Sequence, residues 1–480
     1  MKLPRRSVDE IVSTVIDAPL GDARRQRRLG QLVRRLAGAP AASLPAALGD
    51  DAQVQGCYRL LNNPAVTFDA LMAPQSDATR VRSEAVGRVL VLHDTTDCSF
   101  PHLDPEAIGY LQTGKAGFRL HLSLVVEADA WRRPLGVVHA ETISRAKKSR
   151  RKKGKASGPQ TAKWQDRESE RWWRGMSSSQ QWLKDCESVI HIADREGDSY
   201  ELMAKLVQAG IHFVIRVRVD RRGRSVDDDD APWSKVRQVA SAAQGLMERQ
   251  VPLSRRKAKG TVRMTGAHPP RKQRIARLGF AATGVVIPRP VYLHDPIPHQ
   301  LQLNLVHVRE IDPPDGEPPV EWLLYTTEPA HSAAQCEQVV DNYRTRWVIE
   351  EFNSAVKTGC AYEEREFETL HALLNALAIS LPIACELLWL RSRARDTPLA
   401  RATDVLTARQ LQVLDALGSR KLGPSPTAQD ALLAVAALGG HLKRNGPPGW
   451  RVLQRGLELL LAYEVGWAAA QARRGRGRKM

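Results

Sequence analysis

The sequence predicts an α/β protein with helical segments at both ends of the chain. Five apolar runs have the length of buried strands, and two stretches between them have helical spacing. The runs cover residues 88–94, 118–127, 136–142, 189–194 and 212–218, and the helical stretches cover residues 164–183 and 199–208. Strands that alternate with helices in this way predict a sheet with helices packed on it.

The composition indicates a globular protein with an anionic partner. The chain has 480 residues, of which 42% are hydrophobic, which is enough for about two to four domains with full cores. Lysine and arginine number 71 and aspartate and glutamate 53, so the formal net charge is +18. A nucleic-acid backbone is the partner that fits this surplus best, although a generally basic proteome or a need for solubility explains it as well.

Three features predict a cytoplasmic protein without a membrane partner. The six cysteines are scattered and form no CxxC pair, as is typical of reduced thiols in a cytosol. The first residues lack the apolar region of a signal peptide. The most apolar stretch, residues 370–390, contains His371, Asn375, Pro382 and Glu386, which favours a packed helix over a membrane span.

The first 75 residues or so are predicted to be helical and strongly basic. Helices are expected over residues 22–36 and 53–61, and the first of these carries six arginines. In a small helical domain this density of arginine is an electrostatic footprint for phosphates. An ordinary solvated cationic face explains the pattern equally well.

Two aspartates follow apolar runs of the predicted sheet. Asp94 ends the run at residues 88–94, and Asp194 ends the run at residues 189–194. A carboxylate at the carboxyl end of a buried strand stands at the mouth of an open α/β sheet, where ligands bind. We therefore expect both side chains at one edge of the sheet.

A third acid lies on a predicted helix at residues 341–359, with Asp341 or Asn342 as its N-cap. Helical spacing places the side chains of one set in a stripe about 60° wide. Most such stripes are solvated faces with spaced charges. Here, however, one acid stands among basic partners, as where a carboxylate holds a metal and cations hold a phosphate. The set consists of Tyr343, Arg346, Glu350 and Lys357.

The three acids together predict a site for two hard cations. Asp94, Asp194 and Glu350 offer only oxygen ligands, which suit Mg²⁺ or Mn²⁺ rather than Zn²⁺. Two such ions about 3.5–4 Å apart activate water and stabilise the leaving oxygen in phosphodiester displacement.

The rest of the chain is predicted to form two further parts. Residues 221–330 separate Asp194 from Glu350 and contain β-like runs at residues 275–286, 301–311 and 322–327, which indicates an inserted β-rich subdomain. Residues 376–480 are rich in leucine and alanine and are expected to be helical.

Several short motifs, taken in order, resemble those of the cut-and-paste DDE transposases of the insertion-sequence-four group, which contains transposon Tn-five. Each motif alone is weakly specific, but the set spans the chain from about residue 15 to beyond residue 360. The matches are residues 20–29 for Leu-Gly-Asp-x-Arg-Arg-x-x-Arg-Leu, Asp94-Thr95-Thr96, residues 194–198 for Asp-Arg-Glu-(small)-Asp, residues 322–324 with 327–329, and Tyr343, Arg346, Glu350 and Lys357 for Tyr-x2-Arg-x3-Glu-x6-Lys.

The resemblance implies a ribonuclease-H-like catalytic core at residues 76–375 with the β-rich insertion at about 221–330. It also implies a helical domain at residues 1–75 that binds transposon ends, and a helical dimerisation domain at residues 376–480. Buried helix faces explain the pattern of the last segment equally well.

For the chemistry, the resemblance implies that Asp94, Asp194 and Glu350 are the catalytic, metal-binding acids and that two Mg²⁺ or Mn²⁺ ions assist them. The expected reaction is nicking, formation and hydrolysis of a hairpin, and transfer of the 3′-OH ends into target DNA by a homodimer in the bacterial cytoplasm, at the nucleoid. The residues implied to contact DNA are Tyr343, Arg346, Lys357, Arg216, Trp322, Arg25 and Arg28.

Two other functions fit parts of the pattern. A DNA-binding regulator of transposition that has lost catalysis would keep the basic amino-terminal segment. A cellular nuclease on the same core would keep the three carboxylates. The β-rich insertion and the Tyr/Arg/Glu/Lys set favour the transposase.

Overall fold

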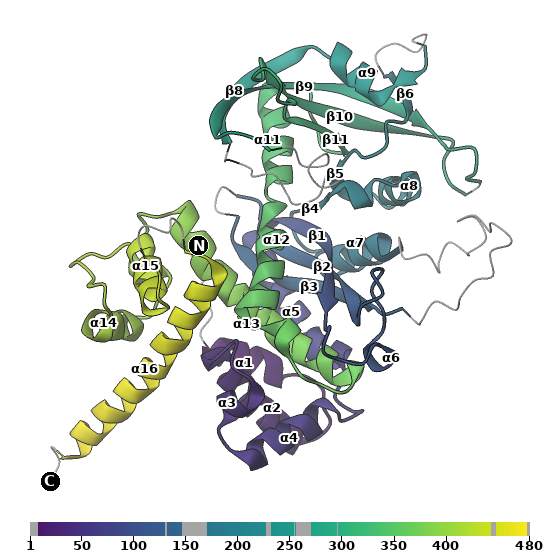
Figure 1. The fold of residues 1–480 in the computed structure, drawn as a ribbon. Helices are drawn as coiled ribbons and strands as arrows, with labels where there is room; N and C mark the ends of the chain where they lie inside the picture. The colour runs from purple at the N-terminus through teal and green to yellow at the C-terminus, as the bar shows by residue number, and fades with distance from the viewer. Residues whose placement is uncertain are drawn as a thin grey trace.

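The computed structural model describes residues 8–129, 132–145, 170–226, 232–253, 255, 270–294, 296–442 and 448–477. One mixed sheet runs through the molecule, with helices on both of its faces and at both ends of the chain (Figure 1). The prediction of an α/β fold is therefore confirmed. The strands are β1 Arg88–Ser99, β2 Gly117–Glu127, β3 Pro134–Ile143, β4 Ser188–Ala193, β5 His212–Arg216, β6 Arg222–Ser225, β7 Ser234–Lys235, β8 Gly245–Leu253, β9 Arg274–Pro288, β10 Gln300–Ile311 and β11 Glu321–Thr326.

The first half of the sheet has the strand order β3-β2-β1-β4-β5. Strands β1, β2 and β3 pair antiparallel, whereas β4 is parallel to β1 and β5 is parallel to β4. This order is compatible with the ribonuclease-H-like sheet that the resemblance implies. The five predicted strands all lie here, and their bounds differ from the expected ones by a few residues.

The two faces of β1 are covered by different helices. Helix α7 (Glu170–Trp182) packs on one face of β1, β2 and β3, and α12 (Trp347–Ser354) packs on β1 from the other side (Figure 1). Alternate side chains of a strand point to opposite faces. Leu90 and Leu92 accordingly join the core that contains Ile349 of α12, whereas Val89 joins a separate cluster.

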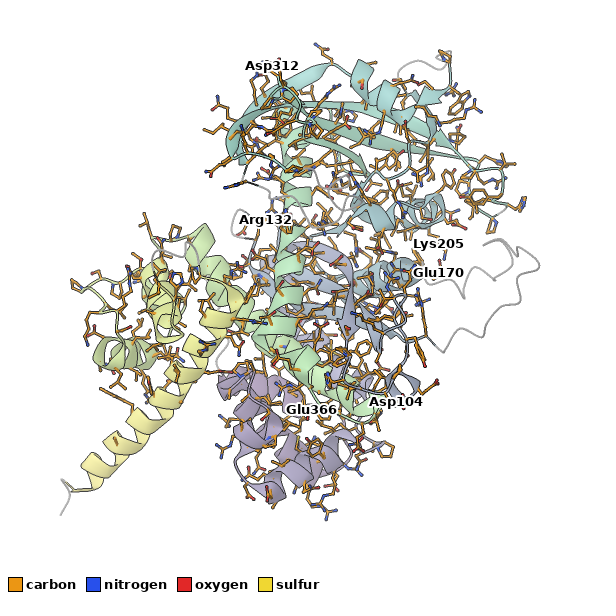
Figure 2. The ribbon with its side chains drawn as sticks, viewed as in Figure 1. Asp104, Arg132, Glu170, Lys205, Asp312 and Glu366 are labelled. Carbon is orange, nitrogen blue, oxygen red and sulfur yellow. The ribbon has the colours of Figure 1, made fainter. Side chains whose placement is uncertain are left out.

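Helix α8 (Tyr200–Gln208) lies beside α7, and a partly buried ion pair joins the two helices. Lys205 Nζ is 3.2 Å from Glu170 Oε2, and the two side chains point toward one another in Figure 2. Ser199 caps α8, since its side chain accepts a hydrogen bond from the backbone N–H of Leu202. The helix predicted at residues 199–208 is thus observed, whereas the helix predicted from residue 164 is observed from Glu170, because residues 164–169 lie outside the described part.

The β-rich segment extends the central sheet. Strand β11 pairs antiparallel with β5, and β10, β9 and β6 follow outward from it. The three predicted strands of this segment are observed as β9, β10 and β11. A separate inserted subdomain stays a prediction, because these strands share one hydrogen-bonded sheet with the core.

The amino-terminal region forms a cluster of helices at one end of the molecule (Figure 1). Asp22 caps α2 through its side chain, which accepts a hydrogen bond from Arg24 N at 2.7 Å. Helix α5 continues past the expected boundary near residue 75 and packs on β3, so the boundary stays a prediction. The helices are α1 Val8–Ile16, α2 Ala23–Gly38, α3 Leu44–Leu48, α4 Asp51–Leu61 and α5 Phe68–Val86.

The carboxyl-terminal region is helical, as expected. Helix α13 crosses the core diagonally, and α16 projects away beside α14 and α15 (Figure 1). Its role in dimerisation stays a prediction. The remaining helices are α6 Pro105–Ile108, α9 Val236–Ala242, α11 Ala333–Arg344, α13 Leu370–Asp396, α14 Ala408–Leu417, α15 Ala428–Leu438 and α16 Trp450–Gly477.

Within the described residues, one segment is long and apolar enough to cross a membrane. It is Leu370–Ala394, of which 82% of the most apolar window is buried inside the protein. Asn375 in this helix donates hydrogen bonds to the backbone oxygens of Leu61 and Val66 at 2.9 and 2.7 Å. The helix therefore packs as a core element against the amino-terminal helices.

Arg365 joins the amino-terminal helices to the core through hydrogen bonds. Its guanidinium donates to the backbone oxygens of Pro40, Ala42 and Cys360 at 2.7, 2.5 and 3.0 Å. Arg365→Met would leave these buried carbonyls without a donor, so we expect a loss of about 3 kcal/mol in the free energy of unfolding. Urea denaturation measures the loss, and limited proteolysis is expected to show faster cleavage near residue 40.

Arg59→Met is the matched control, because Arg59 is exposed on α4 and its guanidinium donates to Gln55 O of the same helix. It is expected to unfold at the wild-type urea concentration. Equal midpoints for the two variants would contradict the role given to Arg365.

Candidate active site

Asp94 lies inside a long strand. Strand β1 continues to Ser99, so the expectation that the strand stops at Asp94 is wrong. The reason is that β2 pairs with β1 along its whole length, whereas β4 pairs with it only as far as Leu92. At Asp94, β1 therefore still pairs with β2, whereas its pairing with β4 has ended. Asp97 lies on the same strand.

Asp194 lies just beyond β4, which ends at Ala193. It caps the short 3-10 helix Arg195–Gly197, and its Oδ1 accepts a hydrogen bond from the backbone N–H of Glu196 at 2.8 Å. The parallel register pairs Leu92 with Ile192. Asp94 and Asp194 each lie two residues beyond this pair, so the register brings both to the same edge of the sheet.

The predicted helix at residues 341–359 is wrong as a single element. Helix α11 begins at Ala333, with Ser332 as a capping box, and ends at Arg344. Helix α12 follows, and a π-helical turn, Ala355–Gly359, ends the series. Neither Asp341 nor Asn342 is the N-cap, because a stronger start signal lies upstream at Ser332. The break near Thr345 and the π turn change the angular phase, so one continuous stripe does not form.

Glu350 of α12 and Asp94 of β1 are each held by a partner from the same helix segment. Arg346 Nη1 is 3.0 Å from Glu350 Oε1, and Asn353 Nδ2 donates to Asp94 Oδ2 at 2.8 Å. These contacts place Asp94 against the face of α12 that carries Glu350. The two acids are 256 residues apart in sequence (350 − 94).

The neighbouring carboxylates raise the pKa of both aspartates. Burial, and then the charge of Glu350, raise the pKa of Asp94 from 3.8 to about 7, with a further contribution from Asp194. Burial also raises the pKa of Asp194, and Glu350 contributes in the same direction. Like charges interact in this way only when they lie near one another. The structure thus brings Asp94, Asp194 and Glu350 into one electrostatic environment.

The donor set fits a hard cation in its chemistry. All three acids offer oxygen, and the buried Oδ1 of Asn353 beside Asp94 has no hydrogen-bond partner among the residues that the structure describes. Among the described residues, however, no group of three or more His, Cys, Asp or Glu side chains is arranged to hold a metal ion. Arg346 instead provides the positive charge next to Glu350 and acts on Asp94 as well.

Arg216, Trp322 and Tyr343 form a second cluster. Strand pairing sets Arg216 of β5 opposite Leu324 of β11, and the Arg216 guanidinium lies 5.9 Å from the centre of the Trp322 ring. Trp322 meets Tyr343 edge to face at 5.5 Å. Tyr343 is only 4% exposed, so its ring packs in the core and does not face solvent as part of a functional stripe.

The other expected DNA contacts lie apart from the carboxylates. Lys357 Nζ donates to the backbone oxygen of Asp97 and lies 3.5 Å from Glu363 Oε1. Arg25 Nη1 donates to Leu20 O at 2.9 Å. The exposed Arg28 lies across Gly56 of α4, where any side chain would meet the guanidinium.

Sequence reasoning missed three residues of this region. Asn353 contacts Asp94, and Trp347, next to Arg346, is 66% exposed. The Asp198 carboxylate accepts the backbone N–H groups of Arg218 and Val219 at 2.6 and 2.8 Å. Helical spacing could have singled out Asn353, three residues after Glu350 on a neighbouring position of the helix. No local signal could have shown that Asp198 binds a segment twenty residues away.

Two protein families match parts of this chain. Residues 11–66 match the family described as Transposase DNA-binding, and residues 174–383 match the family described as Transposase DDE domain. The first match contains Arg25 and Arg28. The second contains Asp194 and Glu350, whereas Asp94 lies before its start.

The chain thus combines a transposase DNA-binding region with a transposase DDE domain on a mixed α/β sheet. Together these two matches support a DNA transposase of the DDE type, an enzyme that acts on DNA.

The raised pKa of Asp94 predicts a pH-dependent stability. The folded protein keeps a proton that the unfolded chain releases near its ordinary pKa of 3.8, and it loses that proton only at about pH 7. Stability therefore falls as the pH rises through this window. Asparagine does not titrate, so we expect Asp94→Asn to avoid a fall of roughly 2–4 kcal/mol in the free energy of unfolding. In EDTA at pH 8 the variant is therefore expected to melt at a higher temperature than wild type.

Thermal unfolding between pH 4.5 and pH 8 measures the effect. Asp97→Asn, at an exposed position on the same strand, is the control and is expected to follow the wild-type curve. If Asp94→Asn followed that curve as well, the electrostatic environment described for Asp94 would be wrong.

Proposed function

We propose that this protein is a cut-and-paste transposase of the insertion-sequence-four group, similar to that of transposon Tn-five. Asp94, Asp194 and Glu350 are its catalytic acids. The observation that carries the proposal is that the parallel register of β1 and β4 brings Asp94 and Asp194 to one edge of the sheet, where Glu350 of α12 raises the pKa of both. A transposase DNA-binding region on the same chain supplies the recognition of DNA.

In this proposal the three acids hold two Mg²⁺ or Mn²⁺ ions. When bound, such ions activate a water or a DNA 3′-hydroxyl and stabilise the leaving 3′ oxygen. Glu350 faces Arg346 in the structure, and Asn353 orients Asp94 through its amide. The raised pKa of Asp94 means that a nearby cation favours the ionised form, which is the form that binds metal.

Residues around the acids are proposed to bind the DNA backbone. Arg346 and Arg216 supply fixed positive charge for phosphates. The Tyr343 ring packs edge to face against Trp322 and holds it in position. Trp322 is half-buried and is proposed to stack on a base near the cleaved end. Lys357 joins them only after leaving the Asp97 carbonyl and Glu363.

Transposon ends are proposed to bind the amino-terminal helices. A groove of about 840 Å³ lies along α2, and its polar lining is Arg27, Arg34, Arg35, Gln26, Gln31, Gln53 and Asp17. Three guanidinium groups and three amides, against one carboxylate, suit a phosphate backbone. Arg28 is exposed beside it, whereas the hydrogen bond of Arg25 to Leu20 O gives that residue a structural role as well.

The complete proposed reaction is nicking, a hairpin at the transposon end, hairpin hydrolysis and joining of the 3′-OH ends to target double-stranded DNA. It takes place in a homodimer in the cytoplasm, at the bacterial nucleoid. The α14–α16 region is the proposed dimer contact. This sequence of steps rests on the resemblance in the motifs, and the carboxylate cluster supports its hydrolytic steps.

Single replacements of the acids test the proposal. Asp94→Ala, Asp194→Ala and Glu350→Ala are each expected to reduce Mg²⁺-dependent cleavage of end-bearing DNA by at least about 1,000-fold, because each removes an oxygen ligand. End binding, measured by gel shift, is expected to survive. Glu351→Gln is the control, since Glu351 is the next residue on the helix and pairs with Arg391 at 3.9 Å.

The same assay separates the other functions. A regulator without catalysis would shift the mobility of a supercoiled plasmid with the cognate ends and never nick it. A cellular nuclease would cleave end-free DNA at the same rate. Undiminished cleavage by one of the alanine variants would remove that residue from the site.

Salt dependence tests the proposed end-binding face. Arg28→Ala is expected to lower the slope of log affinity against log salt by about 0.9, which corresponds to one phosphate contact, at an unchanged melting temperature. Arg25→Ala is expected to lower the melting temperature too, because Leu20 O loses its donor. Fluorescence anisotropy with end DNA at several salt concentrations measures the slopes, and an unchanged slope for Arg28→Ala would place that residue outside the interface.

A further inference from the structure

One arginine of helix α7 connects the two segments that carry Asp94 and Asp194. Arg171 lies near the start of α7, which packs on β1 and β2, and only 5% of the residue is exposed. A buried guanidinium needs partners both for its charge and for its N–H groups. Two partners of Arg171 belong to the strand and the turn that carry the two aspartates.

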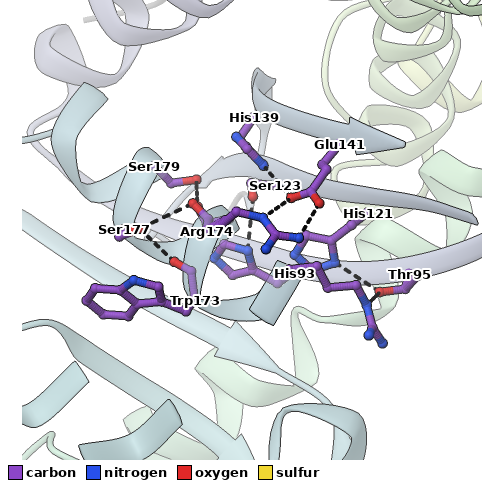
Figure 3. A network of polar contacts seen from close by, with 12 residues as sticks. His93, Thr95, His121, Ser123, His139, Glu141, Trp173, Arg174, Ser177 and Ser179 are labelled. Carbon is purple, nitrogen blue, oxygen red and sulfur yellow. Dashed lines mark hydrogen bonds and ion pairs between the residues drawn. The ribbon is translucent and has the colours of Figure 1, made fainter. Parts of the chain in front are cut away.

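The first partner is the residue that follows Asp94. Arg171 Nε donates a 2.8 Å hydrogen bond to Thr95 Oγ1, and His121 Nδ1 lies 2.9 Å from the same oxygen. Figure 3 shows His121 and Thr95 joined in this way, within a larger network of buried polar groups. The backbone N–H of Thr95 in turn interacts with the Asp94 carboxylate. Successive residues of a strand face opposite sides of the sheet. Thr95 therefore faces α7, whereas Asp94 faces α12 on the other side.

The second partner is the residue that orients Asp194. Arg171 Nη2 donates to Glu196 Oε2 at 2.6 Å, and the backbone N–H of Glu196 donates to Asp194 Oδ1 at 2.8 Å. Arg119 Nη2 approaches the same Glu196 oxygen at 3.4 Å. Two guanidinium groups therefore hold the Glu196 side chain, and this fixes the turn whose amide binds Asp194.

The helix that carries Arg171 lies close to the sheet. A side chain at Gly175 would come within 2.7 Å of His121 Nε2, so only glycine allows this approach. Trp172 meets the His121 ring edge to face at 4.9 Å. The backbone of α7 at Arg171 is consequently held close to the sheet. The planar guanidinium of Arg171 can therefore fix the relative position of two separate segments.

We infer that Arg171 is a positioning residue, which fixes the position of Asp94 relative to Asp194. It acts through Thr95 and Glu196 and touches neither carboxylate itself. This role rests on the proposed function, because it gives the two aspartates a common ligand. Replacing a partner of this kind typically weakens metal affinity about 10- to 100-fold.

Mn²⁺ affinity tests the inference without relying on activity. Isothermal titration of the full chain with Mn²⁺ is expected to show affinity about 10- to 100-fold weaker for Arg171→Gln than for wild type, whereas binding of end DNA in EDTA is unchanged. Glu196→Gln is expected to act in the same direction, and the double variant is expected to be no weaker than the weaker single one, since both residues serve one connection.

Arg174→Gln is the matched control. Arg174 lies on the same helix and pairs with Glu141 at 2.5 and 3.0 Å, with no link to either aspartate (Figure 3). It is expected to bind Mn²⁺ as wild type does. Should Arg171→Gln fail to fold, Thr95→Val removes only the hydroxyl and is expected to weaken Mn²⁺ binding in the same direction.

The outcomes separate this inference from the proposed function. Wild-type Mn²⁺ affinity in folded Arg171→Gln or Thr95→Val overturns the positioning role, even if the wild-type protein cleaves DNA. Weakened affinity in these variants supports the role, even if the wild-type protein cleaves no DNA, which would overturn the transposase alone. A wild-type protein that binds no Mn²⁺ overturns both.

Discussion

The parallel pairing of β1 with β4 is the constraint on which the candidate site depends. The register that sets Leu92 beside Ile192 leaves Asp94 and Asp194 equally far beyond the paired residues. Both leucine and isoleucine belong to the core under α12, so the strands deliver the aspartates toward the helix that carries Glu350. A shift of one residue in this pairing would turn the side chains of one strand to the opposite face and separate the acids.

Burial and the neighbouring carboxylates raise the pKa of Asp94 and of Asp194, and the surrounding residues limit that effect. Arg346 lies beside Glu350 and acts on both aspartates, and Asn353 donates to Asp94. On the far side of the sheet, Arg171 binds the side chains of Thr95 and Glu196, which belong to the same two segments. The acids are therefore supported from both faces of the sheet, by Arg346 and Asn353 on the α12 side and by Arg171 on the α7 side.

The long sheet also explains why residues from the β-rich segment lie near the core. Because β11 pairs directly with β5, Trp322 comes to Arg216 and to Tyr343 of α11. Arg249 of β8 adds a second connection, since it binds Asp341 of α11 at 2.8 Å. The β-rich segment, which separates Asp194 from Glu350 in sequence, thus positions α11, and α11 leads directly into α12, which carries Glu350.

The sequence by itself determined the α/β class and the positions of most strands and helices, and it singled out the three acids as candidates. These features follow from local periodicity and residue chemistry, which act over a few residues. The tertiary structure alone decided that β1 runs past Asp94, that the helix of Glu350 breaks near Thr345, and that Asn353 and Arg171 support the aspartates. Each of these depends on pairing or packing with a segment distant in the chain, and no local pattern encodes which distant segment that is.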